Sequence, residues 1–146
     1  VRSRALHLLA RLRKPGVNES IVARIESKDF SAYELDEKRR FCAAAALTGN
    51  QPEYWAGQFK SNTLIATKAQ EAERHCAAVA LGISLHRASL PVLEKEVTRR
   101  LKSPLVVEGA TWAIQHMGCD RQERTRQLYE LFYHGVLSQR EGEGDE

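Results

Sequence analysis

An internal repeat constrains the fold of this chain more than any other feature of its sequence. Residues 40–47 read RFCAAAAL and residues 74–81 read RHCAAVAL, so six of eight positions are identical at an offset of 34 residues. A weaker copy lies over 107–114, and a degenerate copy lies over 5–12. A period of this length is typical of repeated helical pairs, which bury a continuous core only when neighbouring pairs stack on one another.

The spacing of apolar residues predicts an all-α fold. It is clearest in the stripe formed by Leu90, Leu93, Val97 and Leu101, which recur at helical intervals. Thr67 with Gln70, and Asp120 with Glu123, have the three-residue spacing of a capping box at a helix start. We predict eight helices, over residues 1–14, 18–28, 35–48, 52–61, 68–83, 90–102, 104–117 and 121–138.

Short connections between these helices predict four antiparallel hairpins, near residues 1–28, 35–61, 68–102 and 104–138. Small side chains permit the closest approach of helices, so the alanine-rich segments suit the first helix of each hairpin, between its neighbours. The second helices carry bulkier apolar residues, such as Trp55 and Phe59. The expected architecture is a short right-handed α-α superhelix, or solenoid.

The segments 38–49 and 73–82, in which a charged residue precedes an alanine-rich helix that ends in leucine and glycine, resemble HEAT-like, armadillo-related repeats. The resemblance is strongest to divergent bacterial versions and covers nearly all of the chain before residue 139. It implies a binding scaffold. Tetratricopeptide repeats share the 34-residue period, but their characteristic tryptophan, leucine-glycine and tyrosine spacing is missing, so they are the second choice for the fold.

Length and charge predict one domain over residues 1–138 and a disordered acidic tail over 139–146. The 146 residues are enough to bury a core without disulfides or metal. No stretch approaches the roughly 20 apolar residues that a membrane span needs, so we expect no membrane association. The net charge of +3 combines a basic body with four acidic residues in the last six positions. Because the chain opens at Val1 inside an amphipathic segment, we interpret it as a fragment of a larger protein.

Three cysteines, Cys42, Cys76 and Cys119, form no close pair in the sequence. This pattern indicates a reducing compartment, and we expect a cytoplasmic protein. Cys42 and Cys76 share one position of the repeat, where a buried small residue is favoured over a metal or redox role. His116 and Cys119 have the spacing of half a metal site, but the other half is absent. We predict no metal and no cofactor.

Motifs for catalysis are lacking. The chain has no phosphate-binding loop, no HExxH and no GxSxG. Some HEAT-like proteins are metal-dependent hydroxylases with repeated His-Glu dipeptides, and this sequence contains no His-Glu. We predict that the domain is not an enzyme, although a dispersed active site stays an alternative.

Basic clusters provide the alternative to a protein-binding scaffold. They are Lys38 to Arg40, Arg99 to Lys102, Arg121 with Arg124 and Arg126, and Arg11 to Lys14. If stacking places several on one face, they would contact a phosphate backbone, as the resemblance to HEAT-like DNA-repair glycosylases also implies. Interleaved acidic residues such as Glu37 and Glu96 favour a solvated surface with local ion pairs instead.

The predicted function is therefore a non-catalytic protein–protein interaction scaffold, and the alternative is a nucleic-acid-binding domain. Aromatic and arginine residues dominate interface hot spots. On that basis the candidate binding residues are Arg39, Arg40, Tyr54, Arg87, Arg99, Arg100, Arg124 and Tyr129. The apolar first helix, with Leu6, Leu8 and Leu9, predicts self-association through that end of the solenoid.

Overall fold

The computed structural model describes residues 2–12, 14–60, 67–100 and 102–137, and the regular secondary structure of this part of the chain is all helical, without strands. The α-helices are α1 (Arg2–Leu12), α2 (Val17–Ile25), α3 (Leu35–Thr48), α4 (Pro52–Phe59), α5 (Lys68–Ile83), α6 (Leu90–Thr98), α7 (Pro104–Gly118) and α8 (Arg121–Tyr129). Shorter turns are η1 (Lys28–Ala32), η2 (Arg87–Ser89) and the π-helical η3 (Glu130–His134). The predicted all-α class is confirmed, and the predicted tail over 139–146 lies outside the described residues.

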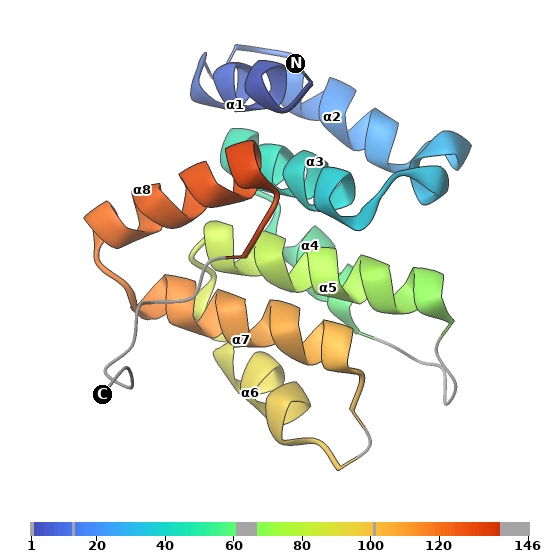
Figure 1. Ribbon diagram of the computed structural model, residues 1–146, viewed down its shortest axis with the longest axis vertical. Helices are drawn as coiled ribbons and strands as arrows, with labels where there is room; N and C mark the ends of the chain where they lie inside the picture. The colour runs from blue at the N-terminus through green and yellow to red at the C-terminus, as the bar shows by residue number, and fades with distance from the viewer. Residues whose placement is uncertain (1, 13, 61–66, 101, 138–146) are drawn as a thin grey trace.

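The helices that carry the repeated segments pack side by side in chain order, α1 on α3, α3 on α5 and α5 on α7 (Figure 1). On this stack, α2 packs against α3, α4 against α5, and α6 against α7. The alanines explain the stack, because Ala43, Ala44, Ala78 and Ala80 are fully buried and leave room only for another helix.

Glycines bring α5 and α7 closest together. A Cβ atom added at Gly109 would lie 2.8 Å from the backbone oxygen of His75, and one added at Gly82 would lie 2.8 Å from the Cα atom of Ala113. Neither position has room for a larger residue without movement of the partner helix. Among the described residues, the contact between these two helices is the most extensive.

Local capping chemistry sets the helix starts. Thr67 and Gln70 form the predicted capping box, with reciprocal hydrogen bonds of 3.2 and 2.9 Å. Ser103 caps α7 through the amide of Val106, and a proline follows at the first helical position, where its missing amide costs nothing. Asp120 accepts a hydrogen bond from the amide of Glu123. The predicted helix starts are therefore confirmed to within two residues wherever these signals occur.

The outer helices add the bulky core residues. Trp55 and Phe59 of α4 are buried, as predicted. Arg74 of α5 is also buried; its Nε atom donates to the carbonyl of Phe59 at 2.7 Å, and its guanidinium pairs with Glu96 of α6 at 3.1 Å. The guanidinium also lies 4.9 Å from the centre of the Phe59 ring. One buried arginine thus connects α4, α5 and α6.

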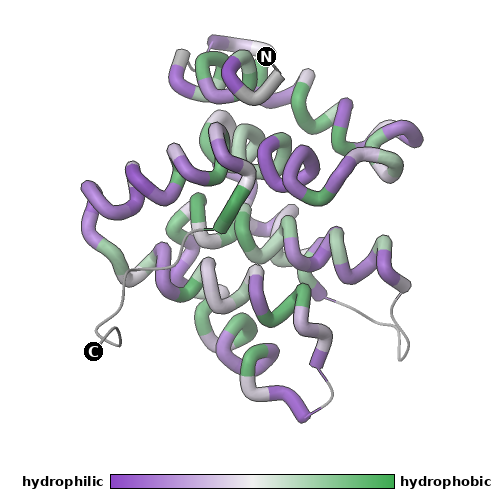
Figure 2. Tube along the Cα trace, in the orientation of Figure 1, coloured by the Kyte–Doolittle hydropathy of each residue, from purple (hydrophilic) through white to green (hydrophobic). Residues whose placement is uncertain are grey.

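The last helical segment crosses the stack instead of extending it. From the end of α7, α8 runs back towards α1 and α3, and η3 contacts both of these helices (Figure 1). Figure 2 shows that α8 is mostly hydrophilic, whereas the stacked helices are mixed. The apolar anchors lie in η3, where Leu131 and Phe132 are fully buried. None of the helices described is both long and apolar enough to cross a bilayer.

Candidate binding cleft

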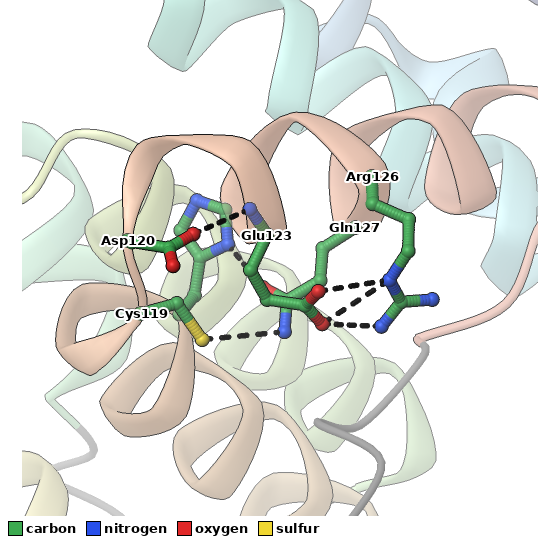
Figure 3. Close-up of polar contacts among 6 residues, drawn as sticks. Cys119, Asp120, Glu123, Arg126 and Gln127 are labelled. Carbon is green, nitrogen blue, oxygen red and sulfur yellow. Dashed lines mark hydrogen bonds and ion pairs between the residues drawn. The ribbon is translucent and has the colours of Figure 1, made fainter.

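A polar network fixes α8 to the end of α7 (Figure 3). The Nδ1 atom of His116 and the side-chain oxygen of Gln127 are 2.6 Å apart, and both residues are buried. The Gln127 amide nitrogen donates to the sulfur of Cys119 at 3.7 Å, so its oxygen accepts from His116. Asp120 caps the helix, and the carboxylate of Glu123 pairs with Arg126. The first turns of α8 are therefore held in one orientation.

A second set of contacts holds the other end of this segment. His7 of α1 is hydrogen-bonded to the hydroxyl of Tyr133 at 2.8 Å and stacks on Phe132 with ring centroids 4.9 Å apart. Gly135 adopts a left-handed backbone conformation with φ of 70°, which favours glycine. Its carbonyl accepts a hydrogen bond of 2.6 Å from Arg39 of α3. The segment from α8 to Gly135 thus spans from α7 to α1 and α3.

Between α8 and the stack lies an open cleft of about 820 Å³. The helices α1, α3, α5 and α7 all contribute residues from their carboxyl-terminal halves, and α8 supplies the opposite wall. The lining residues are His7, Ala10, Arg11, Leu47, Ile83, Leu85, His116, Arg121, Arg124, Thr125, Leu128 and Tyr129. We call this site the α8 cleft.

The α8 cleft is basic. Three arginines line it, Arg11 from α1 and Arg121 and Arg124 from α8, and its described lining contains no aspartate or glutamate. Arg124 also donates a hydrogen bond to the carbonyl of Cys119 at the end of α7, and this bond holds its guanidinium beside the cleft. A guanidinium has five N–H donors, so this contact leaves most of the Arg124 donors available to a ligand.

Burial lowers the pKa of both histidines in the cleft, which favours their neutral forms. Burial, with a smaller effect from Arg124, lowers the pKa of His116 to about 4, although its hydrogen bond to Gln127 opposes the shift. Burial, followed by the charge of Arg11, lowers the pKa of His7. The lasting positive charge of the cleft therefore comes from its arginines, which stay protonated at physiological pH.

This arrangement is suited to binding an anionic group. Planar guanidinium groups match carboxylate and phosphate geometry, and bidentate pairs of this kind are among the stronger polar contacts in proteins. Tyr129, with 52% of its surface exposed, adds an aromatic side chain at the same site. Leu47, Ile83 and Leu128 provide an apolar floor.

Two of the eight residues predicted from the sequence to bind a partner, Arg124 and Tyr129, line the α8 cleft. Arg87 does not line the cleft, but its guanidinium donates to the carbonyl of Met117 at the end of α7, next in the chain to the lining residue His116. The structure therefore brings three of the predicted residues to one end of the molecule.

The other five predicted residues lie elsewhere. Arg39 is buried between His75 and Gly135, and Arg40 forms an ion pair of 3.3 Å with Asp36. Tyr54 is half-buried and lies 3.4 Å from a carboxylate oxygen of Glu26. Arg99 pairs with Glu96, and Arg100 is exposed beyond the end of α6. The eight residues do not form one patch.

Sequence reasoning missed Arg11, Arg121, His7 and His116 as parts of one site. Arg11 and Arg121 were recognised as members of basic clusters, but 110 positions separate them in the chain. No local pattern indicates that α8 turns back on α1. His116 and Cys119, which have the spacing of half a metal site, are bridged by the side chain of Gln127. Among the described residues, no three histidine, cysteine or acidic side chains gather closely enough to hold a metal ion.

Comparison with known proteins provides no relative. No family model, no curated protein and no solved structure matches this chain. The function of the chain is therefore inferred from its own geometry.

Proposed function

We propose that this chain is a non-catalytic binding domain that holds an acidic segment of a protein partner in the α8 cleft. The observation that carries the proposal is the convergence of Arg11, Arg121 and Arg124 on a cleft whose described lining has no acidic residue. Carboxylates of the partner pair with the arginines, and Tyr129 with the apolar floor contacts its side chains. No bond is broken in this function.

The stack of α1, α3, α5 and α7 supports the wider architecture of this proposal. We interpret the stacked helices, with their outer helices, as a short HEAT-like α-α superhelix of about four hairpins. In this interpretation α8 closes the last hairpin across the ends of the stacked helices and so forms the cleft. A cytoplasmic location agrees with three free cysteines and remains part of the proposal.

Nucleic acid is the second candidate, because the same arginines would bind phosphates. The basic clusters beyond the cleft argue against an extended phosphate contact. Arg39 is buried, and Arg40 and Arg99 are engaged in ion pairs with Asp36 and Glu96. A compact set of three arginines fits a short acidic segment better than the backbone of a duplex.

Fluorescence anisotropy with a labelled glutamate- and aspartate-rich peptide, and in parallel with a labelled DNA duplex, tests the proposal. We expect the peptide to bind and the double substitution Arg11→Glu with Arg121→Glu to weaken binding by more than about 10-fold, because two attractive contacts become repulsive. Both side chains are exposed, so the fold is retained.

Arg100→Glu is the matched control, since it reverses one exposed charge outside the α8 cleft. If Arg100→Glu weakened peptide binding as much, for each reversed charge, as the double substitution does, the α8 cleft would not be the binding site. Repeating both titrations at several salt concentrations separates the two ligands. The nucleic-acid function would be favoured if the duplex bound more tightly than the peptide, and if the logarithm of its affinity fell with the logarithm of the salt concentration with a slope near −0.9 for each phosphate contacted.

A further inference from the structure

A strained turn at the end of α5 borders the α8 cleft. Directly after the C-cap residue Ser84, Leu85 has a φ of 55°, in the left-handed region of backbone space. Among the described residues, the other positions with a positive φ are both glycines, Gly16 and Gly135. In this region the Cβ atom of an L residue crowds the following carbonyl oxygen, so a leucine there is strained.

The backbone needs this conformation because it closes α5 as a Schellman motif. The amide of Leu85 donates to the carbonyl of Gly82 at 3.0 Å, and the amide of His86 donates to the carbonyl of Leu81 at 3.2 Å. These two hydrogen bonds satisfy carbonyls of the last helical turn. Glycine is the usual residue at the left-handed position of the motif, because it has no Cβ atom. Helix termination therefore favours glycine at position 85, and the leucine needs another explanation.

The side chain of Leu85 faces the cleft and provides that explanation. Leu85 is a lining residue of the α8 cleft, and 36% of its surface is exposed. By contrast, Leu47 and Leu128, which also line the cleft, are partly buried against the hydrophobic core. Strained backbone positions cluster at ligand-binding sites, where the surrounding structure holds them in place. An exposed apolar side chain on a strained backbone, at the wall of a cleft, is therefore suited to contact with a ligand.

Neighbouring contacts hold the turn in position. The amide of Arg87 donates to the carbonyl of Leu85 at 3.0 Å, and the guanidinium of Arg87 donates to the carbonyl of Met117 on α7 at 3.3 Å. The Nδ1 atom of His86 lies 2.7 Å from the hydroxyl of Ser89. The turn is thereby attached to α7, and Leu85 is held at the cleft wall before a partner binds. Such preorganisation reduces the entropy lost on binding.

We propose that Leu85 is a specificity-determining residue of the α8 cleft, and that it selects an acidic segment which also carries a large apolar side chain. This inference rests on the proposed function, since the same segment supplies the carboxylates that bind Arg11, Arg121 and Arg124. The apolar side chain of the partner packs on Leu85 and on Ile83, which lines the cleft beside it. A purely acidic segment leaves this apolar surface in water and binds more weakly.

A double-mutant cycle between the chain and a peptide tests this selection. Two labelled peptides rich in glutamate and aspartate differ at one central position, which is leucine in the first and alanine in the second. We expect the leucine peptide to bind the unaltered chain about 10-fold more tightly, because it buries the larger apolar side chain. In Leu85→Gly this preference should fall below about 3-fold, because the contact on which it depends is removed. Fluorescence anisotropy measures the four affinities.

Leu85→Asn is a second variant, because asparagine adopts the left-handed conformation more readily than leucine but has no apolar surface. It should lose the preference for the leucine peptide as Leu85→Gly does. Val92→Ala is the matched control, since Val92 is 43% exposed on α6 and does not line the cleft. It should keep the preference of the unaltered chain. Thermal unfolding checks that the variants are folded, and neither substitution at Leu85 is expected to lower the melting temperature, because both relieve the strained backbone.

The outcomes separate this inference from the proposed function. If the unaltered chain bound both peptides equally, or if the preference survived in both Leu85 variants, Leu85 would not determine specificity. A lowered melting temperature in both Leu85 variants, with the peptide preference unchanged, would show instead that the leucine is held for packing within the chain. If neither peptide bound any of these chains, the proposed function would fail, and this inference would fail with it.

Discussion

At the scale of single residues, His75 shows how a buried polar group ties the stacked helices together. Its Nδ1 atom lies 2.8 Å from the carbonyl of Leu105 on α7, and its Nε2 atom lies 3.1 Å from a guanidinium nitrogen of Arg39 on α3. Arginine only donates, so Nε2 must accept, and Nδ1 carries the proton. The network therefore requires the neutral imidazole in one tautomer.

This requirement makes stability depend on pH. The pKa of His75 is about 4, lowered by burial and by Arg39, although its hydrogen bond to Leu105 opposes the shift. In the unfolded chain the value is about 6.5. Because the unfolded state binds more protons between these values, the stabilisation is complete above pH 6.5 and is lost as the pH falls towards 4. His116, also near 4, behaves in the same way.

We expect the free energy of unfolding to fall by about 2 kcal/mol for each of the two histidines when the pH is lowered from 7 to 5. His75→Gln should remove about half of this combined loss, whatever its effect on stability at pH 7. Urea unfolding of both chains at the two pH values, followed by tryptophan fluorescence, measures the difference. A variant with the same pH-dependent loss as the unaltered chain would contradict the assignment.

The burial of Arg39 is the main point at which residue-level prediction was limited. Arginine is almost never fully buried unless paired, so a Lys-Arg-Arg sequence at a helix start predicts an exposed patch. Here Arg39 meets two acceptors that come from residues 75 and 135. Nothing within one turn of the sequence indicates either partner.

At the scale of helices, the sequence predicted the starts and the contacts of the repeated segments well. These features depend on local signals, namely the capping of Thr67 and Asp120 and the alanine-rich faces. The helix ends were less accurate. The segment predicted as one helix to residue 102 ends at Thr98, and the predicted last helix changes to a π-helical turn at Glu130. Contact with α1 and α3 fixes that turn, so only the tertiary structure specifies it.

The close approach of α5 and α7 gives a prediction at this scale. Gly109→Ala places a methyl group 2.8 Å from the His75 carbonyl oxygen and 3.0 Å from its Nδ1 atom. His75 is held by hydrogen bonds on both ring nitrogens and does not move aside easily. We expect a loss of about 1–3 kcal/mol in the unfolding free energy, as for other overpacked cores, and urea unfolding at pH 7 measures it.

Gly57→Ala is the control for this substitution. Gly57 lies in the exposed part of α4, and an added Cβ atom meets nothing within 4 Å. Because alanine is the better helix former, we expect Gly57→Ala to stabilise the chain by up to about 1 kcal/mol. If both substitutions changed stability in the same direction and by the same amount, the steric explanation for Gly109 would fail.

At the scale of the whole molecule, the α8 cleft depends on a long-range return of the chain. Its arginines come from α1 and α8, and contacts between His7 and Tyr133 join the two ends of the described chain. The repeat period predicts stacking of neighbours, but it contains no information about a last helix that crosses the stack. The composition of the basic clusters was therefore visible in the sequence, whereas their arrangement into one cleft was not.

The first helix of the stack leaves an apolar face without a neighbour among the described residues. Leu8 and Leu9 of α1 are 49% and 40% exposed. Leu9 also lines an open groove of about 730 Å³ with Val17 and Ile21 of α2. Stacked helical repeats need a polar cap or a further repeat at each end. A second copy of the chain would cover this face in the isolated domain.

We therefore expect the isolated chain to dimerise through α1, and Leu8→Glu to make it monomeric. Sedimentation over a range of concentrations measures the association. Because half of the Leu8 side chain is already exposed, the substitution introduces charge at the contact without disturbing the core. Val92→Glu on α6, where the valine is 43% exposed, is the matched control and should leave the dimer intact. A chain that is monomeric at every concentration, or one that both substitutions dissociate equally, would show that the exposed face of α1 is not the interface.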